Sequence, residues 1–271
     1  MRLVFSFQLF KSHSYFPPIW SGCRVKFIHS ASHVFDAIIL KIKAQDSCAE
    51  LLALKLESIL KKVDWYFDFI SPFAYLQFSQ FKKFENKLNI TIHPVLFGAL
   101  LKHWGQLGPA EIVPKRIFTY RFFKWKADSL GIKYTMPPSH PFNPLPALLA
   151  CIAGSSTFEV TQEIFDTIYK KGLQPDKKKG IEKLEAIAKK HASEHSNLDE
   201  KSLKKILRTN TSKAIENGVF GVPTFVVEEQ VFWGGDATDM MLDFIRNPGL
   251  FSTEEMKRVS SMPMGLVRNK S

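Results

Sequence analysis

Cysteine is scarce in this chain of 271 residues, and so are long apolar runs. The three cysteines, Cys23, Cys48 and Cys151, lie far apart, and no Cys-x-x-Cys occurs. A disulfide scaffold needs more cysteines at closer spacing and is therefore excluded. No uninterrupted run of about 18 apolar residues is present, so we expect no membrane partner or membrane span. Apolar residues still make up 45% of the chain, which is enough for a globular core and excludes a mainly disordered protein.

Acidic residues are missing from residues 1–35, although four basic residues occur there. A basic, serine-rich segment without acids is typical of an organellar transit peptide. A wrongly assigned start is a second explanation, because no methionine lies between Met1 and Met136. We expect residues 1–60 to be an N-terminal extension outside the fold, either a leader, a transit peptide or a mis-assigned start. The expected location is cytoplasmic, or the mitochondrial matrix if a transit peptide is present.

The net charge of +11 invites a nucleic-acid or anion-binding interpretation. Residues 1–62 hold nine basic and four acidic residues, so part of the excess belongs to the extension. The densest later region, Lys170–Lys205, has eleven lysines, but six acids are interleaved with them. This pattern is typical of a solvated helix face, whereas nucleic-acid binding favours arginine and aromatic residues together. We therefore expect no nucleic-acid partner.

A strand–helix–strand unit opens the structured part. The aromatic and β-branched run Val63–Ile70 predicts a buried strand, and Ser71-Pro72 is a favourable helix start. Apolar residues at helical spacing then predict a helix to about Leu88. Residues 90–96 predict a second strand, parallel to the first.

The order of the later elements indicates the fold class. Helices are predicted at 98–103, 114–130, 145–153, 161–170, 181–191 and 198–217, then strands at 222–227 and 230–233 and a helix from an N-cap at Asp236 to Arg246. This is an α/β, thioredoxin-like fold (βαβ…ββα) with an inserted all-helical domain. The expected boundaries are 61–97 and 198–247 for the thioredoxin-like domain, 98–197 for the insertion, and 248–271 for a frayed C-terminal tail.

Three short motifs carry the candidate chemistry. Ser71-Pro-Phe-Ala74 occupies the turn where thioredoxin folds hold Cys-x-x-Cys, so exchange by protein thiols is excluded and a serine hydroxyl can donate to a ligand thiolate. Phe220-Gly-Val-Pro-Thr224 places a proline before the third strand, where such folds have a cis-proline. Phe232-Trp-Gly-Gly-Asp236 allows close backbone approach. Each motif alone also has an ordinary explanation, as a capped helix, a strand start and a turn.

Taken together, these motifs and Asp64–Tyr75 resemble the 2-hydroxychromene-2-carboxylate isomerase family. That family is related to kappa-class glutathione transferases and to DsbA-type thioredoxin folds. The resemblance covers residues 63–247 and implies a glutathione-dependent isomerase, in which the glutathione thiolate adds reversibly to a conjugated, small aromatic substrate. A homodimer is compatible with this interpretation.

The resemblance also implies a glutathione site and a catalytic serine. Ser71 corresponds to the serine that hydrogen-bonds the glutathione sulfur. Val222, with Pro223 behind it, would pair with the cysteinyl backbone. Gly235 and Asp236 would hold the γ-glutamyl end.

The inserted helices supply further candidates for glutathione binding. Gln106 stands where the kappa-class relatives have an asparagine, and either Lys115 or Arg116 matches their lysine. In the isomerases, Gly235 is commonly asparagine and Ala237 commonly arginine. Because of these two differences, the resemblance does not identify the exact substrate.

Other functions compete with this one. The chain could be a kappa-like glutathione transferase, a non-catalytic thioredoxin-fold binding protein, or a basic anion-binding protein. Metal is not expected, because His93, His103 and His140 show no metal-ligand spacing. Cys151, on an apolar helix, is expected to be buried and inert.

Overall fold

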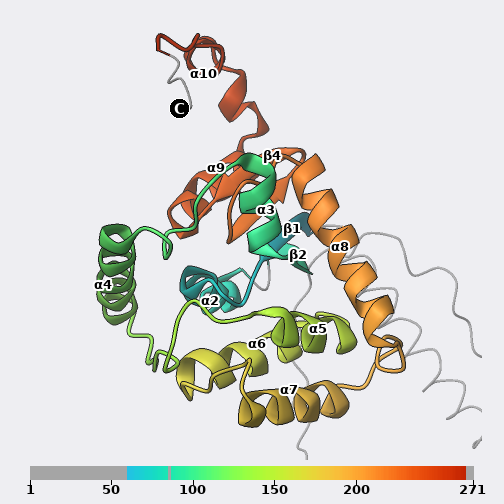
Figure 1. Ribbon diagram of the computed structural model, residues 1–271. Coiled ribbons are helices and arrows are strands. Elements are labelled where there is room, and N and C mark those ends of the chain that lie inside the picture. Colours follow the sequence, from blue (N-terminus) through green and yellow to red (C-terminus); the bar gives the residue numbers. More distant parts are fainter. Residues whose placement is uncertain (1–59, 85–86, 267–271) are drawn as a thin grey trace, which may run out of the picture. The chain divides into compact units, whose positions relative to one another are not determined.

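The computed structural model describes residues 60–84 and 87–266. The predicted extension therefore lies outside the described residues, apart from residue 60. Within the described part, four strands form one sheet in the order β2-β1-β3-β4 (Figure 1). The strands are β1 (Lys61–Phe67), β2 (Leu88–Pro94), β3 (Thr224–Val227) and β4 (Gln230–Trp233). β1 and β2 are parallel, whereas β3 runs antiparallel to both β1 and β4. The predicted order βαβ…ββα is confirmed.

β1 is a central strand, and its sequence alternates between two cores. Trp65 and Phe67 point to one face and are fully buried with the helices of the larger core. Tyr66 points to the opposite face, where it packs with Leu100 and Ala214. Side chains alternate across a strand, so a run that is apolar at successive positions must be covered on both sides.

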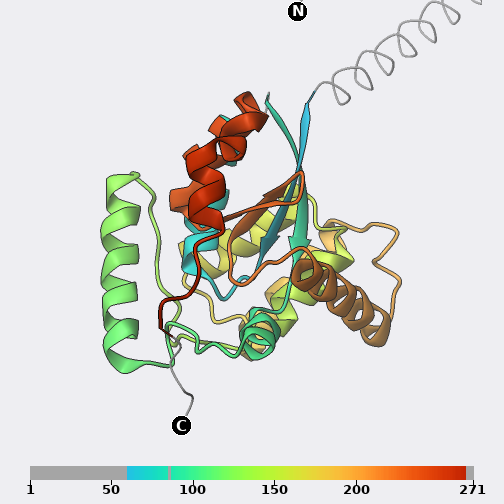
Figure 2. The same cartoon turned by 90° about the horizontal axis from the view of Figure 1, so that it is seen from above.

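Helices supply this cover. They are α2 (Pro72–Phe78), α3 (Phe97–Trp104), α4 (Val113–Ser129), α5 (Leu145–Ala153), α6 (Phe158–Phe165), α7 (Lys178–Lys190), α8 (Glu200–Glu216), α9 (Thr238–Arg246) and α10 (Glu254–Ser260). α3 and α8 contribute to the core on the Tyr66 face, and α2 and α9 to the core on the Trp65 face. The segment from α3 to α7 is inserted between the βαβ unit, formed by β1, α2 and β2, and the part formed by α8, β3, β4 and α9. α4 stands at one side of the other helices in both views (Figures 1 and 2).

α2 is shorter than the sequence predicted. It ends at Phe78 rather than near Leu88, and the 3-10 turn Phe81–Lys83 follows. The chain must turn back here because Leu88 pairs with Lys61 at the start of the two parallel strands. The Phe81 side chain packs into the core from this turn, and its ring centroid lies 4.8 Å from that of Trp65.

The prediction of a frayed tail was wrong for residues 254–260, which form α10. The Thr253 side chain caps this helix by accepting a hydrogen bond from the Met256 N–H, and Glu255 pairs with Arg258 one turn later. Acids in the first turn and bases in the last complement the helix dipole. Local capping and charge order therefore explain a helix in a segment with few apolar residues.

Candidate functional site

Ser71 begins α2 as the sequence predicted. Its backbone is extended, its hydroxyl accepts a hydrogen bond from the Ala74 N–H at 3.3 Å, and Pro72 occupies the first helical position. The residue is 8% exposed. The same hydroxyl donates a long hydrogen bond, 3.4 Å, to the carbonyl oxygen of Val222, which lies 151 residues further along the chain.

The other two motifs lie beside this contact. The Val222–Pro223 peptide bond is cis. The carbonyl of Pro223 accepts a hydrogen bond of 2.8 Å from the N–H of Gly234. Ser71, the Val222–Pro223 pair and the glycine turn are thus joined by consecutive hydrogen bonds, although the chain brings them from three separate segments.

Gly221 shows why a glycine precedes Val222. A Cβ at this position would lie 2.5 Å from Nε1 of Trp233, and two more atoms of the indole would be 3.1 Å away. Trp233 in turn packs edge-on against Phe220, with ring centroids 5.2 Å apart. The Trp233 indole therefore lies directly against the backbone of Gly221, which a side chain at this position would prevent.

Gln77 is a buried polar residue that the sequence analysis missed. Its Oε1 accepts a hydrogen bond of 2.7 Å from Nε1 of Trp65. Its Nε2 donates at 3.1 Å to both the Gly234 carbonyl and the Thr238 hydroxyl. The side chain therefore ties α2 to the turn that carries Gly235 and Asp236. A glutamine among apolar residues of a short helix is the signal that could have identified it.

Asp236 does not cap α9, so the predicted N-cap was wrong. It lies inside the 3-10 turn Gly235–Ala237, and α9 begins after Ala237 without a side-chain cap. The Asp236 side chain is 83% exposed, and its Oδ1 lies 3.9 Å from Nζ of Lys126 on α4. The carboxylate is therefore available to a ligand at this end of the turn.

The candidates from the insertion lie apart from this network. Gln106 follows Gly105, whose left-handed backbone ends α3. Lys115 and Arg116 belong to the first turn of α4. Gln106 and Lys115 are exposed and Arg116 is half-buried. Among the described residues, no hydrogen bond or ion pair from these three side chains reaches Ser71. Their roles remain predictions.

Asp68 supports the turn from within the core. It is fully buried, and its two carboxyl oxygens accept hydrogen bonds from the Ile70 N–H at 3.0 Å and the Phe97 N–H at 2.9 Å. Burial raises the pKa of Asp68 to about 7, against the two hydrogen bonds, which lower it. This carboxyl group therefore titrates near neutral pH.

Cys151 is buried, and its thiol is not a nucleophile. Burial raises the pKa of this thiol to about 11, which keeps it protonated. Within residues 60–84 and 87–266, no group of three or more histidine, cysteine or acidic side chains is arranged to hold a metal. In the same residues no helix has the length and apolar character needed to cross a membrane.

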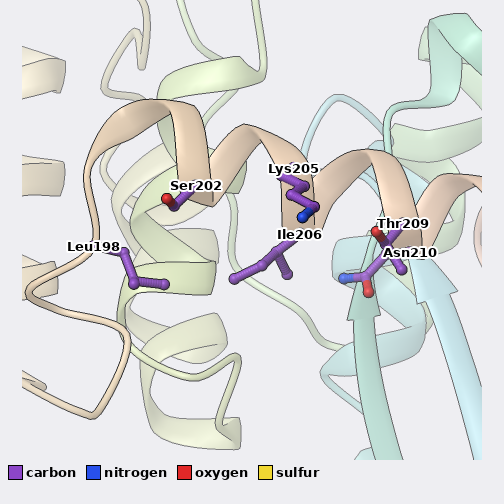
Figure 3. Close-up of a pocket in the computed structure, with 6 residues that line it drawn as sticks. All are labelled: Leu198, Ser202, Lys205, Ile206, Thr209 and Asn210. Carbon is purple, nitrogen blue, oxygen red and sulfur yellow. The ribbon is translucent and has the colours of Figure 1, made fainter.

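A cavity of about 370 Å³ lies along α8 (Figure 3). It is lined by Leu198, Ser202, Lys205, Ile206, Thr209 and Asn210. None of these is a sequence-predicted site residue. The geometry around Ser71 therefore defines the candidate site, because the three motifs meet there and none of them contributes to the cavity.

The comparisons with known proteins agree with this topology. The family model of the DsbA-like thioredoxin domain matches residues 62–246. The chain belongs to the DsbA-like thioredoxin family. The solved structure of a 2-hydroxychromene-2-carboxylate isomerase superposes with a TM-score of 0.54 at 22% identity, covering 69% of this chain and 95% of that one. The thioredoxin-like fold with inserted helices is therefore shown.

Two groups of curated relatives are similar to the chain. The 2-hydroxychromene-2-carboxylate isomerase of Sphingobium xenophagum is 26% identical over 204 residues, covering 68% of this chain and 98% of that protein. Glutathione S-transferase kappa 1 of Caenorhabditis elegans is 25% identical over 210 residues, covering 70% and 92%. The family resemblance predicted from the sequence is confirmed, and the relatives are enzymes.

Proposed function

We propose that the protein is a glutathione-dependent isomerase of the 2-hydroxychromene-2-carboxylate type. The observation that carries the proposal is the Ser71 hydroxyl, at the start of α2 and 3.4 Å from the Val222 carbonyl. This is the turn where a thioredoxin fold performs thiol chemistry, and here Ser71 and Ala74 stand at the two cysteine positions, so a hydroxyl replaces the first sulfur. The relatives named as isomerases support the same activity.

The residues present fit a tripeptide with one thiol. Among the described residues the Val222 N–H donates no hydrogen bond, so this N–H and the Val222 carbonyl can pair with a ligand backbone. The exposed Asp236 carboxylate suits an ammonium group, and its contact with Lys126 is long, at 3.9 Å. We assign Val222, Pro223, Gly235 and Asp236 to glutathione binding on this basis.

Ser71 would act as the donor to sulfur. Bound glutathione supplies a thiolate that adds reversibly to a conjugated aromatic substrate, permits bond rotation and leaves. The Ser71 hydroxyl has one proton, and its present bond to Val222 is long, so turning it toward sulfur costs little and frees the Val222 carbonyl. Lowering a thiol pKa of about 8.5 by two units needs about 2.7 kcal/mol, which is within reach of one charge-assisted hydrogen bond and its surroundings.

The insertion would contribute charge to the same site. We propose that Lys115 or Arg116, with Gln106, binds a carboxylate of glutathione, and that residues 98–197 form the helical domain covering residues 61–97 and 198–247. A kappa-like glutathione transferase is the second candidate, favoured by the kappa relative and by Gly235 and Ala237 in place of the isomerases' asparagine and arginine.

Calorimetric titration with glutathione tests the proposal. The protein should bind glutathione at or below millimolar concentration, with a rise in thiolate absorbance that Ser71→Ala abolishes. Absence of both heat and a thermal shift at millimolar glutathione would exclude a glutathione enzyme and leave a non-catalytic binding protein. Catalysed isomerisation of 2-hydroxychromene-2-carboxylate identifies the isomerase, whereas conjugation of an electrophilic aryl halide without isomerisation identifies the transferase.

A further inference from the structure

His140 contacts the peptide bond that leads into Ser71, although none of the roles above involves it. Its Nε2 lies 2.7 Å from the carbonyl oxygen of Ile70, the residue before Ser71. The hydroxyl of Tyr120 on α4 lies 2.8 Å from His140 Nδ1 and 2.8 Å from the His140 carbonyl oxygen. A chain of hydrogen bonds therefore runs from α4 through the imidazole to the Ser71 turn.

The direction of each hydrogen bond follows from the groups involved. A carbonyl oxygen only accepts, so the His140 Nε2 must carry the proton in the bond to Ile70. In the neutral imidazole Nδ1 is then an acceptor, so the single proton of the Tyr120 hydroxyl is shared between Nδ1 and the His140 carbonyl oxygen, which can both only accept. Burial lowers the pKa of His140 and so favours this neutral form near pH 7. The hydrogen bond to the Ile70 carbonyl opposes the shift. The tautomer and the ring orientation are thus both fixed.

The Ile70 peptide is held at both ends. Its N–H donates to Asp68 Oδ1 at 3.0 Å, and its carbonyl accepts from His140. The Ser71 N–H donates to the Asp68 carbonyl at 3.0 Å. The backbone just before Ser71 therefore has little freedom, and the hydroxyl is aimed by these contacts.

The two supports differ in where they come from. Asp68 is fully buried in the thioredoxin-like part, whereas His140 and Tyr120 are half-buried and belong to the insertion. Burial raises the pKa of Tyr120, and the charge of Arg116, one turn earlier on α4, opposes the shift. The insertion thus contacts the Ser71 turn through polar groups next to a proposed glutathione-binding residue.

We infer that His140 and Tyr120 are positioning residues for Ser71: the imidazole holds the Ile70–Ser71 peptide, and the Tyr120 hydroxyl holds the imidazole. This inference rests on the proposed function, because the property being positioned is the hydrogen bond from Ser71 to the glutathione sulfur. Neither side chain needs to touch the substrate.

The test measures the thiol pKa of bound glutathione from its ultraviolet thiolate absorbance as a function of pH. The variants are His140→Ala, His140→Gln and Tyr120→Phe, each measured beside a calorimetric Kd and a thermal unfolding midpoint. Tyr75→Phe is the matched control, because its hydroxyl also donates to a backbone carbonyl, that of Lys133, at 3.2 Å. It should lower thermal stability in the same way and leave the thiol pKa unchanged.

The expected pattern separates positioning from stability. His140→Ala should raise the thiol pKa by about one unit and reduce turnover about 10-fold, while the Kd changes less than about threefold. His140→Gln should recover most of the loss, because its amide can donate to the Ile70 carbonyl in place of Nε2. Tyr120→Phe should give an intermediate shift.

Three results would overturn the inference. A folded His140→Ala variant with an unchanged thiol pKa rejects positioning while the proposed function stands. A shift in Tyr75→Phe equal to that in Tyr120→Phe shows that both act only through stability. Failure of the unmodified protein to bind glutathione rejects the proposed function, and the inference with it.

Discussion

The two sides of the candidate site are built differently. On the sheet side, Ser71 and Val222 are each 8% exposed, and hydrogen bonds link them to each other and to the glycine turn. On the insertion side, Lys115 is exposed, and Lys126 meets the 83% exposed side chain of Asp236, from the glycine turn, only at 3.9 Å. Packing determines the geometry of the sheet side, whereas the geometry of the insertion side depends on charged side chains that a ligand can reorient.

α4 shows this difference within one helix. Phe123 and Ala127 are buried against the core, while Phe118 and Trp125 are 66% and 61% exposed. Apolar residues thus lie around the whole helix, and no single stripe marks the face that docks. Mutations that compare the two sides should therefore affect the sheet side through geometry and the insertion side through charge.

The largest effect is expected from Ser71→Ala. Loss of the hydroxyl removes the donor to the glutathione sulfur, so turnover should fall about 100-fold or more, in the range known for loss of one hydrogen-bond donor to a developing anion. Steady-state rates and the thiolate absorbance of bound glutathione measure this directly.

Ser79→Ala controls for damage to α2. Ser79 lies at the other end of the same helix, where its hydroxyl donates to the Tyr75 carbonyl at 2.8 Å. It should change stability slightly and leave turnover intact. Equal turnover in Ser71→Ala and the unmodified protein would remove the chemical distinction between the two sides.

Gly221→Ala is expected to have the next largest effect. The added Cβ would meet the rigid indole of Trp233 at 2.5 Å, and displacing that ring should cost about 1–3 kcal/mol of unfolding free energy. Gly98→Ala on α3 is the matched control, since no atom lies within 4 Å of its Cβ, and it should stabilise by about 0.5–1 kcal/mol. Chemical denaturation compares the two, and a neutral Gly221→Ala would mean that the indole moves freely.

The sequence predicted the sheet side far better than the insertion side. A helix cap at Ser71 and a proline before a strand are local patterns, and the structure brings them together because the βαβ…ββα order requires it. Gln77 was missed because two of its three partners, Gly234 and Thr238, lie more than 150 residues away along the chain. The choice between Lys115 and Arg116 could not be made from the sequence, because exposed charged side chains leave no pattern of burial.

Asp68 predicts a specific dependence of stability on pH. Its folded pKa of about 7 lies above the value of about 3.9 expected in the unfolded chain, so the folded state binds more protons in between. The unfolding free energy should therefore fall as the pH rises from about 4 to 7, by an amount on the order of 2–4 kcal/mol. Asp68→Asn should flatten this slope, although loss of one acceptor should cost about 1–3 kcal/mol at low pH.

Asp199→Asn provides a control of opposite sign. The hydrogen bonds from Ser202 lower the pKa of Asp199 at the start of α8. The stability that Asp199 contributes is present above the unfolded pKa and is lost as the pH falls, so its replacement should alter the acid side of the curve only. Denaturation curves across the pH range that show no slope near neutrality would contradict the role of Asp68.

Lys115→Ala and Arg116→Ala should give the smallest effects. Each removes one exposed or half-buried charge, so glutathione affinity should fall roughly threefold to tenfold, and less at high salt because exposed charges are screened. Lys102→Ala on α3 is the matched control and should not change affinity. Calorimetry at two salt concentrations decides which basic residue binds the carboxylate. If Lys115→Ala or Arg116→Ala lowered turnover as much as Ser71→Ala, the insertion side would be held as firmly as the sheet side.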